Sequence, residues 1–138
     1  MVLLLAPLVC LALADEPLEQ LKAKAAAASG GDRAILYARV ARGEVEVANQ
    51  HFTDGNVDRG HASVRQAVAY ARKAGDAASR SKKKLKETEM SLRRTARRLS
   101  DIGGTLAVDD RPAVEQAVTE IQSIEDQLLK VMFGEGKT

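Results

Sequence analysis

An apolar residue recurs at every seventh position between Val64 and Leu106, and this repeat constrains the fold more than any other feature of the chain. The positions are Val64, Ala71, Ala78, Leu85, Leu92, Leu99 and Leu106. Charged and polar residues fill most of the positions between them, which is typical of one face of a long amphipathic helix. The repeat therefore predicts a helical protein with coiled-coil-like packing.

Few aromatic residues are available to build a core. They make up only 3% of the chain, and there is no tryptophan. Compact cores usually rely on aromatic side chains for buried area, so Ala, Val, Leu and Ile must supply it here. Closely spaced helices suit such small side chains, and we expect a single all-α domain over residues 15–138.

Turn and capping residues divide this domain into four expected helices. Gly30 and Gly55 follow the first and the second helix, and Gly104 follows the third. Asp110 and Pro112 are typical of the first turn of the last helix. The expected helices cover residues 17–29, 33–53, 58–102 and 111–133.

Gly75 is the weak point of the long central helix, because Gly can end a helix and the following Asp76 can cap a new one. The seven-residue spacing nevertheless continues from Ala71 to Ala78. We therefore favour one central helix of about 40 residues, roughly 60 Å long, shared by two helical hairpins. A fold-back at Gly75 is the alternative and would give a compact four-helix bundle.

Residues 1–14 are almost wholly apolar and end in Ala-Leu-Ala, a small-x-small cleavage pattern. The segment is typical of a secretory signal peptide and is shorter than the roughly 20 apolar residues of a membrane span. The sequence thus predicts an exported, periplasmic or secreted protein without a membrane span in the mature chain. The alternatives are an uncleaved apolar N-terminus and lipidation of Cys10, the one cysteine.

Aliphatic, aromatic and small residues flank a turn at Gly55 and Asn56. They are Val47, Phe52, Val64 and Ala67. In this arrangement residues 44–72 resemble a tetratricopeptide repeat, a helical hairpin that usually occurs in tandem arrays. The resemblance implies a hairpin that binds peptides or partner proteins. No second copy recurs at a spacing of about 34 residues, whereas arrays need roughly three copies.

Basic residues concentrate between Arg80 and Arg98, where nine Lys and Arg minus two Glu leave a local charge of +7. A helix of this kind can bind phosphates or lipid headgroups. It has no aromatic residues to stack on bases, which argues against nucleic acid. The candidate anion-binding residues are Lys82, Lys83, Lys84, Lys86, Arg93, Arg94, Arg97 and Arg98. The alternative is a solvated face, partly paired with the last helix.

The last helix is acidic, and opposite charges beside an apolar seam would fix the register of an antiparallel helix pair. The seam expected to mediate interaction comprises Leu85, Leu92, Leu99, Val118, Ile121, Ile124 and Leu128. A lone two-helix hairpin buries little surface. We therefore expect a protein partner or a homodimer that completes a four-helix bundle.

Sites for chemistry are scarce. His51 and His61 flank a turn with two aspartates between them, but they lack the spacing of three or four residues at which helical ligands hold zinc. No nucleophile lies beside a base in the sequence. We therefore expect no cofactor, metal or catalysis, and predict a structural or adaptor protein of the cell envelope that resembles exported bacterial helical proteins of unknown function. Electrostatic binding of an anionic surface is the alternative function.

Overall fold

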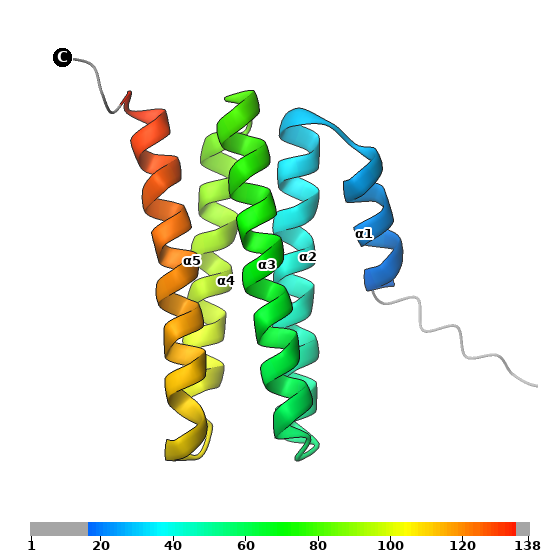
Figure 1. The fold of residues 1–138 in the computed structure, drawn as a ribbon, viewed down its shortest axis with the longest axis vertical. Helices are drawn as coiled ribbons and strands as arrows, with labels where there is room; N and C mark the ends of the chain where they lie inside the picture. The colour runs from blue at the N-terminus through cyan, green and yellow to red at the C-terminus, as the bar shows by residue number, and fades with distance from the viewer. Residues whose placement is uncertain (1–16, 135–138) are drawn as a thin grey trace, which may run out of the picture.

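The computed structural model describes residues 17–134, which form a set of long helices (Figure 1). These are α1 (Leu18–Ala27), α2 (Gly30–Thr53), α3 (Val57–Ser81), α4 (Leu85–Gly104) and α5 (Arg111–Met132), with a 3-10 turn, η1 (Val108–Asp110), before α5. No strand occurs in this part of the chain. The all-α prediction is confirmed, whereas the signal-peptide prediction falls on residues outside the described range.

Helices α2 to α5 form a compact four-helix bundle that consists of two antiparallel hairpins. The most extensive packing joins α2 to α3 and α4 to α5. Contacts of α3 with α5 and of α2 with α4 hold the hairpins side by side. Although α3 and α4 are consecutive, they touch only sparsely, so they occupy opposite corners of the bundle. Helix α1 packs outside, against α2 (Figure 1).

The expected continuous helix over residues 58–102 is wrong, because the chain turns back at Lys82–Lys84. Lys82 and Lys84 adopt left-handed backbone conformations with φ of 55° and 58°. In an unbroken helix, Arg80 would lie one turn from Lys84, and Lys82 one turn from Lys86. Such like-charged pairs destabilise a helix. Folding back also covers the apolar faces of both halves with the other helices.

The seven-residue repeat continues across this break, because the three-residue turn leaves the apolar residues at intervals of seven in the sequence. Ala78 and Leu92 remain in phase and are both buried, but they enter the core from different helices. The Ser81 hydroxyl ends α3 by donating a hydrogen bond to the Ala77 carbonyl, at 2.7 Å. The Lys83 backbone N–H donates to the same hydroxyl oxygen, at 3.2 Å.

Gly75 does not break the helix, so the fold-back expected there as the alternative is at the wrong residue. It is buried within α3, where a Cβ atom would lie 2.5 Å from Cγ2 of Ile124. The glycine instead lets α3 and α5 approach each other closely. Gly75 therefore marks close packing of two helices rather than the end of a helix.

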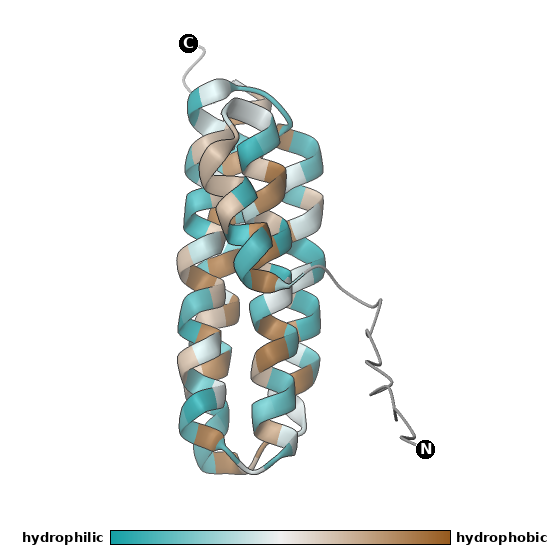
Figure 2. Ribbon diagram, turned by 90° about the vertical axis from the view of Figure 1, so that its right-hand side faces the viewer, coloured by the Kyte–Doolittle hydropathy of each residue, from teal (hydrophilic) through white to brown (hydrophobic). Residues whose placement is uncertain are grey.

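Most of the other helix ends lie within two residues of the prediction, but α2 begins at Gly30 rather than at residue 33, with Ser29 as its N-cap. Gly55 has a φ of 81°, and the Asn56 N–H donates to the His51 carbonyl at 2.8 Å, which closes the end of α2. Pro112 lies in the first turn of α5. Along each bundle helix, apolar residues recur between polar ones, as the hydropathy colouring shows (Figure 2). The apolar residues form one core shared by the four helices.

Candidate functional site

The seven residues of the expected interaction seam lie inside the core of a single chain. They are Leu85, Leu92, Leu99, Val118, Ile121, Ile124 and Leu128. Four of them have no exposed surface, and the rest are buried or partly buried. Because the helices of one chain already bury the seam, a second copy of the chain is not needed to cover it. Self-association stays a prediction.

Two of the eight candidate anion-binding residues are held by carboxylates of other helices. Arg98 donates two hydrogen bonds to Glu46 of α2, at 2.8 and 3.2 Å, and these hydrogen bonds lower the pKa of Glu46. Arg93 forms ion pairs with Glu89, on its own helix, and with Glu125 of α5. These two arginines tie α4 to its neighbours.

The remaining six candidates and Arg80 are exposed and form no ion pair within residues 17–134. We call this set the basic face. It comprises Arg80, Lys82, Lys83, Lys84, Lys86, Arg94 and Arg97. Its members lie at the end of α3, in the turn, and along the exposed side of α4. The one exposed acid in this stretch is Glu87, so the face presents almost unopposed positive charge.

Local backbone structure adds to the positive potential of the turn. Helix α4 begins at Leu85 with Lys84 as its N-cap and without a side-chain cap. The unpaired N–H groups of a helix start carry partial positive charge, which disfavours lysines beside it. Two left-handed non-glycine residues add strain of about 1–3 kcal/mol each. An anion bound here would relieve the charge repulsion.

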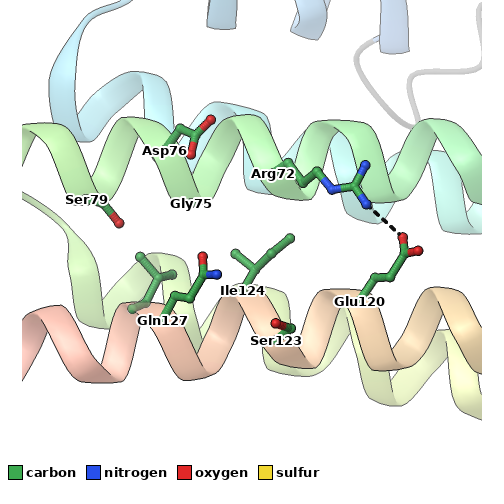
Figure 3. Close-up of a pocket in the computed structure, with 9 residues that line it drawn as sticks. Arg72, Gly75, Asp76, Ser79, Glu120, Ser123, Ile124 and Gln127 are labelled. Carbon is green, nitrogen blue, oxygen red and sulfur yellow. Dashed lines mark hydrogen bonds and ion pairs between the residues drawn. The ribbon is translucent and has the colours of Figure 1, made fainter.

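Within residues 17–134, Glu125 is the one acid of the last helix that pairs with the basic stretch, through Arg93. Glu120 of α5 instead accepts a hydrogen bond from Arg72 of α3, at 3.0 Å. This ion pair spans a shallow groove of about 300 Å³ between α3 and α5. Figure 3 shows Gly75 and Ile124 at the groove, with Ser79 and Gln127 also lining it. Asp76 lines the groove as well, so two of its three charged groups are already paired with each other.

A buried carboxylate pair lies between α4 and α5, and the sequence analysis missed it. Glu89 is 3% exposed and Glu125 is 6% exposed. Burial raises the pKa of Glu125 to about 7, assisted by the Glu89 charge and partly opposed by Arg93. One oxygen of Glu125, Oε2, is buried without a hydrogen-bond partner in the described chain. Both residues occupy core positions of the helical period, which was the available sequence signal.

Helix α1 is held to the bundle by a second polar cluster. Lys22 forms an ion pair at 2.9 Å with Glu44, which is 5% exposed. Desolvation opposes the charge of Lys22, but hydrogen bonds to Glu44 and Glu19 outweigh it and raise the pKa of Lys22. The Lys22 ammonium also lies 5.3 Å from the centre of the Tyr70 ring. This arrangement positions α1 rather than a reactive group.

His61, one of the two histidines that flank the turn between α2 and α3, contacts an aromatic ring and a carboxylate. His61 packs edge-on against Phe52, with ring centres 5.2 Å apart, and its Nε2 lies 3.8 Å from Asp110. Over residues 17–134, no group of three or more His, Cys, Asp or Glu side chains is arranged to hold a metal ion. No described helix is long and apolar enough to cross a membrane.

Residues 44–72, which resemble a tetratricopeptide repeat, lie in the α2–α3 hairpin. Val64 is only 3% exposed and packs against the bundle core, and it lines a groove of about 390 Å³ between α3 and α5 together with His61 and Ala117. The repeat-like peptide-binding role stays a prediction. Comparison with known proteins found no matching family model, curated protein or solved structure.

Proposed function

We propose that the protein is a non-enzymatic adaptor that docks on a polyanionic surface through its basic face. The observation that supports this function most directly is the set of seven exposed cations without an ion pair in the described chain. The apolar seam, which favoured a structural role, is buried within the bundle. The basic face is the largest unsatisfied feature that remains.

The charge of this face is suited to a surface rather than to a small ligand. Its residues extend from the turn along α4, a helix of 20 residues and therefore about 30 Å long. Each Lys or Arg near an anionic surface contributes about 1 kcal/mol, and the effect falls off within a Debye length. Several such residues acting together give useful affinity that falls steeply with salt.

Export belongs to the same proposal. The apolar residues 1–14 are proposed to direct secretion and to be removed, which places the basic face outside the cytoplasm. The mass of the protein recovered from the periplasm or medium tests this step. Retention of residues 1–14 on a cytoplasmic protein would contradict it.

The docking proposal is tested with two triple variants of equal charge. The test variant carries Lys82→Gln, Lys86→Gln and Arg94→Gln on the basic face. The control carries Arg39→Gln, Arg59→Gln and Arg65→Gln, which are exposed elsewhere. Lys83 and Lys84 are kept because they pack over Gly31.

Binding to inorganic polyphosphate is measured by fluorescence anisotropy at several salt concentrations. The test variant is expected to bind on the order of 100-fold more weakly, and the control to change little. The wild type should lose affinity as salt rises. Equal losses in both variants, or salt-independent binding, would show that the basic face is not the docking surface.

A further inference from the structure

Two large apolar side chains are exposed at the C-terminal end of α5. Phe133, which caps the helix, is 82% exposed, and Val131 is 36% exposed. Water-exposed phenylalanine is unfavourable because its ring is wholly apolar. A solvent-exposed ring beside a second exposed apolar side chain is therefore a candidate anchor for a partner.

The fold places this end of α5 level with the lysine turn. Ile124 of α5 packs against Gly75 of α3, and Phe133 lies nine residues beyond Ile124. Ser81, the last residue of the parallel helix α3, lies six residues beyond Gly75, and the lysine turn follows it directly. In Figure 1 the end of α5 and the connection between α3 and α4 appear at the same end of the bundle. The lysine turn and Phe133, which caps α5, are about 50 positions apart in the sequence and thus lie at the same end of the bundle.

Charge and apolar area at one end of a molecule favour a particular kind of partner. Lysines attract acidic headgroups, while an aromatic ring beside them enters the boundary between headgroups and acyl chains. A soluble polyanion offers no apolar phase for the ring. An acidic peptide or protein would need a concave surface to hold the ring, and the groove nearest this end lies along the side of the bundle, between α3 and α5.

We propose that this end of the bundle docks on the surface of a lipid bilayer with anionic headgroups. The lysines of the turn contact the phosphates, and Phe133 inserts as the apolar anchor. The proposal rests on the proposed function, because it names the polyanionic surface that the basic face binds. It adds an anchor that charge alone does not require.

The chain lacks tryptophan, so a single introduced indole reports its own surroundings. Phe133→Trp places one at the proposed anchor. Val108→Trp is the matched control, because Val108 is 73% exposed in η1, beyond α4 and far from the lysine turn. Both proteins are mixed with vesicles of phosphatidylcholine alone and of phosphatidylcholine with phosphatidylglycerol, and emission is recorded.

The expected result is a blue shift for Phe133→Trp with the anionic vesicles only, and none for Val108→Trp. In vesicle sedimentation, Phe133→Ser should bind roughly 10-fold more weakly than wild type, whereas Val108→Ser should bind like wild type. The test triple variant should bind anionic vesicles on the order of 100-fold more weakly than wild type. Phe133→Ser should leave polyphosphate binding unchanged.

Other outcomes separate the two proposals. Salt-dependent binding to polyphosphate without binding to anionic vesicles would overturn the bilayer and keep a soluble polyanion or acidic protein as the partner. If vesicle binding depends on the lysines but the tryptophan emission of Phe133→Trp does not shift, the proposed insertion of Phe133 is overturned. If neither polyphosphate nor vesicles bind, both the proposed function and this inference fail.

Discussion

The two hairpins of the bundle bury very different side chains. The α2–α3 hairpin is closed mainly by alanines, which are Ala34, Ala38, Ala41, Ala48, Ala67, Ala71, Ala74 and Ala78. The α4–α5 hairpin buries Leu92, Leu99, Ile102, Val114, Ile121, Ile124 and Leu128. Small side chains let two helices approach closely, whereas large ones supply more apolar area per residue.

Each hairpin places its buried charge accordingly. The alanine-rich hairpin carries its buried acid, Glu44, at the edge, where α1 supplies Lys22 as partner. The hairpin with large side chains encloses Glu89 and Glu125 between its helices, with Arg93 reaching them from the surface. We therefore expect the α2–α3 hairpin to be destabilised most by side chains too large for its closely packed helices. We expect the α4–α5 hairpin to be destabilised most by loss of apolar area and by ionisation of its buried carboxylates.

Truncating a large side chain should give the largest effect. Leu92→Ala is expected to lower the free energy of unfolding by about 3 kcal/mol, because it removes a fully buried side chain and leaves a cavity. Ala71→Gly in the other hairpin should lower it by only about 1 kcal/mol. Urea unfolding followed by circular dichroism measures both. Equal losses would break the comparison between the hairpins.

Enlarging a small side chain should reverse the order. Ala71→Leu is expected to destabilise by about 2 kcal/mol, because the closely packed α2–α3 seam has no room for the added atoms. Leu92→Met keeps the volume of its site and should change stability by less than about 1.5 kcal/mol. The same unfolding measurement applies. A more stable Ala71→Leu protein would show that the alanine seam is not tightly packed.

The buried carboxylates should make stability depend on pH. The folded protein holds the pKa of Glu125 at about 7, above its ordinary value of 4.5, so the folded state binds the proton more tightly than the unfolded state does. This contribution is present below pH 4.5 and is lost as the pH rises towards 7. Unfolding free energy should fall by roughly 2 kcal/mol between pH 5 and pH 8.

Glu125→Gln is the control for this pH effect, because glutamine keeps the shape and does not titrate. It should flatten the dependence between pH 5 and pH 8, while Glu115→Gln, on the exposed side of α5, should leave it intact. A profile unchanged by Glu125→Gln would assign the titration to another group.

The turn that joins the hairpins should give the smallest effect. Lys82→Gly removes the steric strain of the left-handed conformation but increases the entropy of the unfolded chain. The net effect is expected to be a stabilisation of about 0.5 kcal/mol. Lys86→Gly lies within helix α4 and should instead destabilise by up to about 1 kcal/mol. Thermal unfolding resolves the opposite signs. Destabilisation by Lys82→Gly would mean that this backbone conformation carries no strain.

Local sequence was sufficient for the class of fold and for most helix ends. Propensity, the helical period and turn residues such as Gly55 act within a few positions of the chain, so they can be read without the partner helices. They predicted helices close to α2 and α5 and a turn near Gly104. The concentration of positive charge between Arg80 and Arg98 was equally visible, because it is a property of neighbouring residues.

The tertiary structure alone decided how these helices meet. A repeat reports which face of a helix is covered but not what covers it, so the same spacing fits one long helix or two shorter ones separated at Lys82–Lys84. Gly75 could be understood only once Ile124 lay against it. The pairing of Arg98 with Glu46, and the placement of the end of α5 at the same end of the bundle as the lysine turn, depend on segments far apart in the chain. The sequence supplied the charged residues, and the fold selected which of them remain free to bind.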